Sequence, residues 1–148
     1  MPQYHRELAV AGRMSDLPEI LAFVETVCEQ SGVFPTLVFD LQLAVEEACA
    51  NVIEHAYGGK GGDLAITFET RGCDVVVTLQ DHGSPFAPEE IIAPDMNVPL
   101  TKRRIGGLGM HLMAELMDGV QFDFAKGTNT LVMIRRNAVS MPPADCDA

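Results

Sequence analysis

The chain has 148 residues, of which 47% are hydrophobic and 21% are charged. These values are typical of one globular domain that buries about two-thirds of its unfolded surface. Acidic residues outnumber basic residues by 21 to 10, which gives a formal net charge of −11. This balance argues against nucleic acid and anionic membrane surfaces as partners, because both need a basic contact face.

The sequence gives no sign of export or of membrane insertion. Residues 1–7 lack the basic and then apolar layout of a signal peptide. The longest apolar runs, such as 75–79, are far shorter than a bilayer span. We therefore expect a soluble, cytoplasmic protein. Neither zinc-ligand nor disulfide-framework spacing joins the four cysteines, which are Cys28, Cys49, Cys73 and Cys146.

The first half of the chain is predicted to form one strand and two helices. Alternating apolar residues predict a strand over 4–10. A helix with apolar residues at three- and four-residue steps begins after Ser15 or Asp16 and ends at Gly32. A second helix follows and spans about 35–57, before a cluster of glycines.

The second half is predicted to hold two hairpins and one helix. Alternating apolar residues predict four strands, at 64–70, 75–80, 120–124 and 130–134. A helix is predicted over 107–117. Between 81 and 105 no periodicity survives and four prolines occur, so this stretch is expected to be a functional lid or to be disordered.

This order of elements predicts the fold class. Runs of antiparallel strands with few helices favour an α/β (α+β) two-layer sandwich over a doubly wound parallel sheet. We expect a mixed, mostly antiparallel sheet with the helices on one face. The domain is predicted to span 1–136, and 137–148 to form a frayed, disordered tail.

The second helix contains the first candidate functional cluster. At 100° per residue, Glu47 and Asn51 lie about 40° apart and one turn from each other, and His55 continues the line. Asn51 can offer an oxygen to Mg²⁺, and Glu47 can accept a proton from an attacking hydroxyl group. Alternatively, Glu47 is a solvated helix residue and Asn51 a satisfied boundary amide, and the helix taken alone favours this simpler interpretation.

The second cluster is Asp81-His82-Gly83, at the end of an apolar strand. A carboxylate held rigidly at a strand end can accept a hydrogen bond from the exocyclic amine of a purine. Gly83 would let the backbone approach a ring closely. An ordinary Asp-x-Gly turn is the alternative.

The third cluster is glycine-rich and precedes an apolar-periodic helix. It comprises Gly106, Gly107, Leu108 and Gly109. Glycines at a helix N-terminus expose backbone N–H groups and the positive end of the helix dipole, which favours phosphate binding. The basic triplet at 102–104 lies just upstream, and it can contact either phosphate or a partner protein.

Together the three clusters resemble the GHKL ATP-binding superfamily, whose domain is the Bergerat fold. The N box resembles residues 47–51, the first glycine box 81–83 and the second glycine box 106–109. Within the superfamily the chain looks most like the bacterial anti-sigma-factor serine/threonine kinases. The matching motifs are Glu-Ala-x-x-Asn-x-x-x-His at 47–55, Asp-x-Gly-x-Pro-Phe at 81–86 and Gly-Gly-Leu-Gly at 106–109.

The resemblance implies a catalytic role for the first cluster. Glu47 would be the general base toward a serine hydroxyl group, and Asn51 would be the ligand of Mg²⁺. The activity implied is an ATP-dependent protein serine/threonine kinase, with ATP and Mg²⁺ as its cofactors.

The resemblance also implies how the nucleotide is held. Asp81 would bind the adenine amino group and Gly83 would shape the pocket floor. The Gly106–Gly109 segment would line the phosphates beneath a lid over 89–105. Thr130 matches a pocket-lining threonine of the family, although Asn129 stands where a second threonine is common.

The partners implied by the resemblance are proteins. Members of this group form homodimers that bind a sigma factor and phosphorylate an anti-anti-sigma (STAS-type) protein. A non-catalytic ATP-sensing interaction domain is the alternative function. The catalytic module of a histidine kinase is disfavoured, because the chain has no room for a dimerising helical hairpin with a phosphoacceptor histidine.

Overall fold

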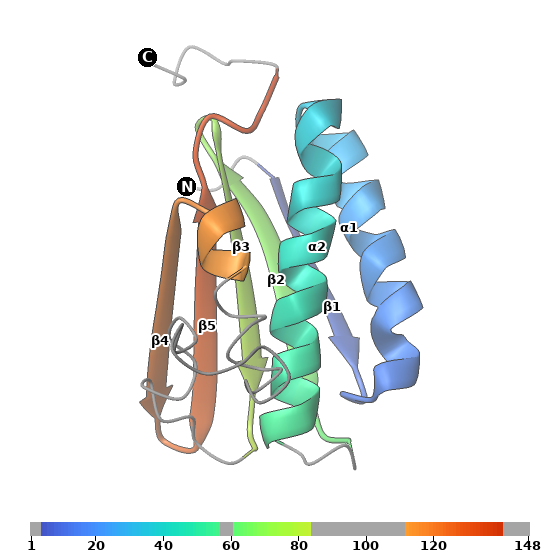
Figure 1. Ribbon diagram of the computed structural model, residues 1–148, viewed down its shortest axis with the longest axis vertical. Helices are drawn as coiled ribbons and strands as arrows, with labels where there is room; N and C mark the ends of the chain where they lie inside the picture. The colour runs from blue at the N-terminus through green and yellow to red at the C-terminus, as the bar shows by residue number, and fades with distance from the viewer. Residues whose placement is uncertain (1–3, 57–60, 84–111, 141–148) are drawn as a thin grey trace, which may run out of the picture.

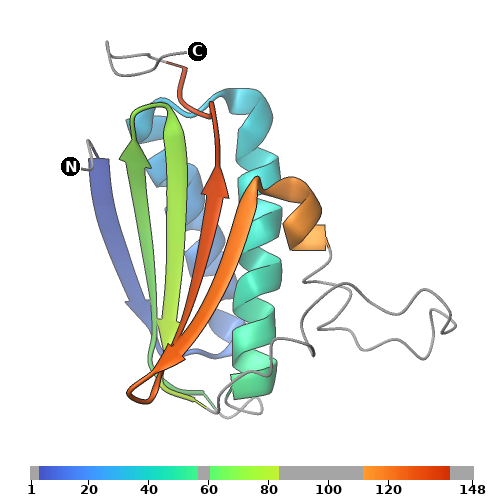
Figure 2. The ribbon, with the colours of Figure 1, turned by 90° about the vertical axis from the view of Figure 1, so that its left-hand side faces the viewer.

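The computed structural model describes residues 4–56, 61–83 and 112–140. Two long helices, α1 (Leu17–Ser31) and α2 (Pro35–Asn51), lie side by side against one face of a five-stranded sheet (Figures 1 and 2). The strands are β1 (Tyr4–Val10), β2 (Leu64–Arg71), β3 (Asp74–Asp81), β4 (Gly119–Ala125) and β5 (Thr128–Arg135). None of the helices in these three ranges is long and apolar enough to cross a membrane.

The strand order is β1-β2-β3-β5-β4, and every neighbouring pair is antiparallel. The predicted two-layer sandwich with helices on one face is therefore confirmed. The expected mixture of strand directions is not found among the described strands. The reason is that two hairpins, β2–β3 and β4–β5, supply four of the five strands, and a hairpin pairs its strands antiparallel.

Turn chemistry explains where the elements end. Gly32 stands at the C-terminal end of α1 with a φ of 81°, a left-handed conformation that glycine adopts without a side-chain clash. The β4–β5 hairpin turns through Lys126 and Gly127, whose φ values are 54° and 78°. Two positive φ angles are characteristic of the type I′ turn, whose twist matches that of the flanking strands.

The helices begin and end close to their predicted positions. A 3₁₀ turn, Met14–Asp16, precedes α1, and the Asp16 carboxylate accepts a hydrogen bond from the backbone N–H of Arg13 at 3.0 Å. Pro35 occupies the first turn of α2, where its missing N–H costs no helical hydrogen bond. A π-helical turn, Val52–Ala56, continues α2. A short helix at 112–116 lies within the predicted 107–117 helix, whose first five residues are outside the described ranges.

The hydrophobic core lies between the helices and the facing side of the sheet. Strand alternation sends every second residue inward, so Ile66, Leu79 and Leu131 are buried from three neighbouring strands. From α2, Leu41 and Val45 are fully buried one turn apart.

We expect Leu41→Ala to lower the free energy of unfolding by about 2–5 kcal/mol, because it removes buried contacts and leaves a cavity. Phe39, two residues away on α2, is 68% exposed and provides the control. Phe39→Ala should change the free energy of unfolding by only about 0.5 kcal/mol. Urea unfolding of both variants measures the difference, and equal losses would contradict this packing.

Residues 137–140 differ from the frayed tail expected after residue 136. Ala138 and Val139 are buried. The Ala138 N–H donates to the Cys73 carbonyl at 2.7 Å, and the Ala138 carbonyl accepts from the Phe34 N–H at 2.9 Å. The start of the predicted tail therefore packs between the β2–β3 turn and the start of α2. The rest of the tail, 141–148, lies outside the described residues.

The cysteines also differ in part from expectation. Cys28 and Cys49 are free and buried, and burial raises the pKa of Cys28 to about 12, so its thiol stays protonated and unreactive. Cys73, in the β2–β3 turn, is disulfide-bonded. The absence of disulfide-framework spacing among the cysteines did not predict this bond.

Candidate functional site

Two candidate side chains lie at the C-terminal end of α2. Asn51 is the last residue of α2 and is only 5% exposed. Its Nδ2 donates a hydrogen bond to the backbone carbonyl of Glu47, one turn earlier, at 2.8 Å. This bond fixes the orientation of the amide and leaves Oδ1 as the atom that can bind a cation.

The backbone at this point departs from a regular α-helix. The N–H of Val52 donates to the carbonyls of both Ala48 and Cys49, and the π-helical turn begins there. Single π-helical turns within helices occur frequently at functional sites. Here the turn follows directly after the residue that the sequence predicts to be a metal ligand.

Glu47 is partly exposed, so it can meet a substrate from solvent. Partial burial raises the pKa of its carboxyl group, and the negative charge of Glu46 raises this pKa further. Adjacent helical residues point about 100° apart, so Glu46 and Glu47 lie on different faces of α2 and interact through charge. A raised pKa makes the Glu47 carboxylate a stronger base.

Asp81 is the last residue of β3 and is only 1% exposed. Its Oδ1 accepts two hydrogen bonds, from the backbone N–H of Gly83 at 2.9 Å and from Nδ2 of Asn129 at 2.8 Å. Both donors converge on one oxygen of the carboxylate. Neither bond uses Oδ2, which is therefore the oxygen that can accept a hydrogen bond from a ligand.

Asn129 is a candidate site residue that the sequence analysis did not select. It pairs with Asp81 in the β3–β5 ladder and is only 4% exposed. One signal could have found it. Leu131 and Met133 point inward, so strand alternation places Asn129 inward as well, as a polar residue at a core position.

Thr130, the residue predicted to line the pocket, does not lie beside Asp81. Because it follows Asn129 on β5, alternation directs its side chain to the opposite face of the sheet from Asp81. It pairs with Gln80 on β3 and with Asp123 on β4. The structure thus brings Asn129, and not Thr130, against Asp81.

The views of the ribbon relate the two parts of the site. Both views place the C-terminal end of α2 and the C-terminal end of β3 at the same end of the molecule (Figures 1 and 2). The side chain of Asp81 points toward the helical layer, since Leu79 and Val77 on the same strand do so. The predicted Gly106–Gly109 segment, the lid and the basic triplet lie outside the described residues.

The protein oxygens at the C-terminal ends of α2 and β3 could bind Mg²⁺ only together with a nucleotide that supplies further oxygen ligands. Within the described ranges, no group of three or more His, Cys, Asp or Glu side chains could hold a metal ion. Mg²⁺ commonly takes one or two protein oxygens and completes its shell with water and phosphate oxygens. Asn51 Oδ1 suits such a site, because its Nδ2 is already bonded to Glu47.

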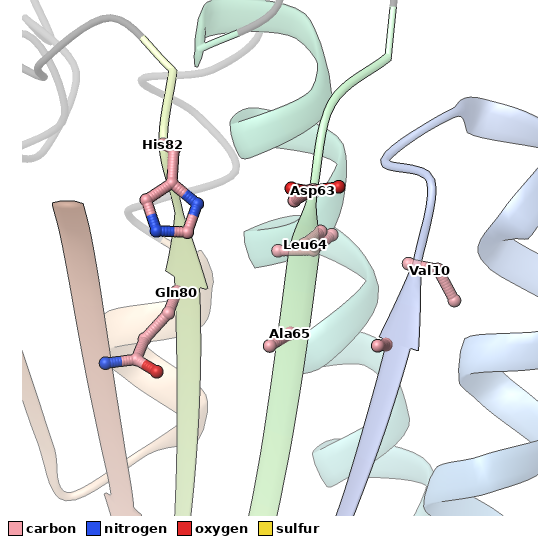
Figure 3. A pocket seen from close by; sticks show the side chains of 7 residues that line it. Val10, Asp63, Leu64, Ala65, Gln80 and His82 are labelled. Atoms are coloured by element: carbon pink, nitrogen blue, oxygen red, sulfur yellow. The ribbon is translucent and has the colours of Figure 1, made fainter. Parts of the chain in front are cut away.

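A separate pocket opens on the face of the sheet that the helices leave uncovered (Figure 3). Its volume is about 150 Å³. It is lined by Ala9, Val10, Asp63, Leu64, Ala65, Gln80 and His82. Gln80 and Asp81 are adjacent and so point to opposite faces, which separates this pocket from the Asp81 carboxylate.

Comparison with known proteins gives the family context of this geometry. The sequence matches the histidine kinase-like ATPase domain over residues 10–135. A serine-protein kinase RsbW of Halalkalibacterium halodurans is 29% identical over 119 residues, covering 78% of this chain and 73% of the relative. An RsbW of Bacillus cereus is 30% identical over 97 residues, covering 63% of this chain and 61% of the relative. The chain thus spans less than two-thirds of the length of that second relative.

A solved structure shares the fold. It contains the RsbU and RsbW domains of a Mycobacterium tuberculosis protein and matches with a TM-score of 0.61 at 16% identity. The match covers 88% of this chain and 32% of that one. At this identity the match supports the fold alone.

Proposed function

Because this chain belongs to the histidine kinase-like ATPase domain family, we propose that it is an ATP-dependent protein serine/threonine kinase. The relatives named as serine-protein kinases support this activity. We further propose that the protein is an anti-sigma regulatory factor. Its substrate would be a serine of an anti-anti-sigma (STAS-type) partner, and it would act as a homodimer that also binds a sigma factor.

One observation carries the catalytic part of the proposal. Glu47, a partly exposed carboxylate with a raised pKa, lies one turn from Asn51, whose amide is fixed by the Glu47 backbone. A protein that only binds nucleotide has no need of a base at this position. In this proposal Glu47 would be the base and Asn51 the metal ligand, both on one rigid helix, as positioning-dominated phosphoryl transfer requires.

In the proposed reaction, Glu47 accepts the proton of the serine hydroxyl group as the serine oxygen attacks the γ-phosphorus of ATP. A bond forms between the serine oxygen and phosphorus, while the bond from phosphorus to the β,γ-bridging oxygen breaks. ADP leaves with that electron pair. Asn51 Oδ1 would hold Mg²⁺, which neutralises phosphate charge when it is bound.

Calorimetric titration with ATP, with and without Mg²⁺, tests the nucleotide site. We expect saturable binding that tightens when Mg²⁺ is added. Incubation with γ-labelled ATP and a STAS-type protein then tests transfer to serine. Absence of ATP binding would contradict the proposal as a whole. Binding without transfer would instead support a nucleotide-sensing interaction domain.

The raised pKa of Glu47 predicts the pH dependence of transfer. Because the base must be ionised, the rate should rise with pH, with a midpoint above the ordinary glutamate value of 4.5. Glu46→Gln removes the neighbouring negative charge, so we expect this midpoint to move to lower pH. Glu25→Gln, an exposed change on α1, provides the control and should leave the midpoint unchanged. A midpoint unaffected by Glu46→Gln would contradict the charge coupling.

A further inference from the structure

The side of α2 that points away from the sheet has a regular pattern of its own. α1 and α2 lie side by side against the sheet, so the opposite side of α2 is turned away from the core (Figures 1 and 2). Along this side run Phe39, Leu43, Glu46 and Ala50, at steps of four, three and four residues. At 100° per residue these positions fall within about 60° of one another. We call these four residues the α2 seam, because their spacing is that of the contact seam of a coiled coil.

The α2 seam is open to contact. Phe39 is 68% exposed, the largest exposed fraction among the large hydrophobic side chains of the described ranges. Leu43, Glu46 and Ala50 are partly exposed, whereas Leu41, on the opposite side of the helix, is fully buried. A side chain as exposed as Phe39 contributes little to the stability of the fold. A large aromatic side chain is, however, the kind of residue that contributes most to the affinity of protein contacts.

The charges around the α2 seam indicate the chemistry of its partner. No Lys, Arg or His residue occurs within α1 or α2. Their charged side chains are all acidic: Glu19, Glu25, Glu29, Asp40, Glu46 and Glu47. The hydrogen bond from Gln42 Nε2 to the Leu21 carbonyl, at 3.1 Å, sets how the two helices lie alongside each other. Because the helices run in opposite directions, Glu25, one turn beyond Leu21, lies at about the level of Phe39.

This charge excludes several other occupants of the surface. A second copy that packed its own α2 seam against this one would place acidic side chains against acidic side chains, which repel each other. Nucleic acid and anionic membranes are repelled for the same reason. A partner with apolar residues flanked by Lys or Arg remains, because it matches both the apolar positions and the charge.

We propose that the α2 seam is a docking surface for an amphipathic helical segment of a partner protein, with Lys or Arg residues beside the apolar residues of that segment. Apolar side chains of the segment pack on Phe39 and Leu43, and a basic side chain pairs with Glu46. A carboxylate left unpaired within such a contact would be costly, so Glu46 selects for a basic partner. The α2 seam extends over about three helical turns, so a segment of similar length can cover it.

Titration with a matched pair of synthetic helical peptides tests this surface. Both peptides carry leucine at heptad spacing, and the flanking positions are lysine in one and glutamate in the other. We expect saturable binding of the lysine peptide and no binding of the glutamate peptide. Phe39→Ala should lower affinity for the lysine peptide about tenfold, as the loss of an aromatic residue from a contact commonly does. Phe124→Ala, which removes a 45% exposed aromatic from β4, provides the control and should leave this affinity unchanged.

A charge reversal tests the polar part of the contact. Glu46→Lys should weaken binding of the lysine peptide and give the glutamate peptide measurable affinity, because the signs of the facing charges are then exchanged. If Glu46→Lys affected neither peptide, Glu46 would not lie in the contact and the proposal would be wrong.

Other outcomes would also overturn the inference. They are no binding of the lysine peptide to the wild-type protein, and equal affinity in the wild type and Phe39→Ala, which would mean that net charge alone attracts the peptide. Sedimentation provides a further check. A wild-type dimer that Phe39→Ala converts to a monomer would show that a second copy occupies this surface instead. None of these measurements needs ATP or phosphoryl transfer, so they decide the docking surface separately from the proposed function.

Discussion

Asp81→Asn should lower the affinity for ATP by about a hundredfold or more. A buried hydrogen bond to a charged group is lost, and two hydrogen-bond donors then face each other. The reason lies in the two donors that converge on Oδ1, the Gly83 N–H and the Asn129 amide. An asparagine at position 81 must turn its carbonyl oxygen to these donors. Its own NH₂ group then replaces Oδ2 and faces the amine of adenine, donor against donor.

The same orientation predicts a reversal of base preference. An NH₂ group at this point can donate to the carbonyl oxygen of inosine triphosphate, so Asp81→Asn should bind that nucleotide more tightly than ATP. Titration calorimetry of both nucleotides measures the effect. The fold should be preserved, because the asparagine carbonyl still satisfies both buried donors. Unchanged ATP affinity would remove Asp81 from the site.

Glu47→Ala is expected to abolish transfer while leaving nucleotide binding close to normal. A general base contributes about 10²–10⁴ in rate, and that factor should be lost from the rate of serine phosphorylation. The dissociation constant for ATP should change by less than about threefold, since in the proposed mechanism the carboxylate meets the incoming hydroxyl group and not the nucleotide. Single-turnover transfer and calorimetry measure the two quantities separately.

The neighbouring carboxylate provides the matched control for this variant. Glu46→Ala removes an adjacent negative charge from the same helix, yet it should retain most of the transfer rate at neutral pH. A parallel loss of binding and transfer in Glu47→Ala would show a structural role. Equal loss of transfer in both variants would mean that the acidic character of the helix matters and that Glu47 itself does not act as the base.

The sequence predicted the architecture well because the spacing of apolar residues depends directly on which side chains are buried. Alternation in β2 and β3 and the apolar line of α2 follow from which side chains face the core. The relation between Glu46 and Glu47 could not be predicted in this way. A helical angle places side chains, but charge acts beyond contact distance where partial burial reduces screening by solvent.

The details of the site needed three-dimensional pairing. Resemblance to a family directed attention to Thr130, whereas strand register brings Asn129 opposite Asp81. The hydrogen bond from Asn51 to the Glu47 carbonyl lies where α2 passes into a π-helical turn. The spacing of residues in the sequence does not predict such a turn. Within the candidate site, therefore, the sequence predicted the residue types, and the structure supplied the orientation of each amide and carboxylate.

The order of the strands also bears on how the protein assembles during folding. β2–β3 and β4–β5 close through two-residue turns, whereas β1 reaches β2 only across both helices. Short-range hairpins form within microseconds, and distant pairings wait for the entropy cost of closing the longer loop. The β1–β2 and β3–β5 pairings both join strands that are far apart in the sequence, so both should form after the two hairpins. Asp81 pairs with Leu64 on β2 and with Asn129 on β5, so its surroundings are complete only after the β3–β5 pairing, and a ligand that binds only the folded state would favour that late step.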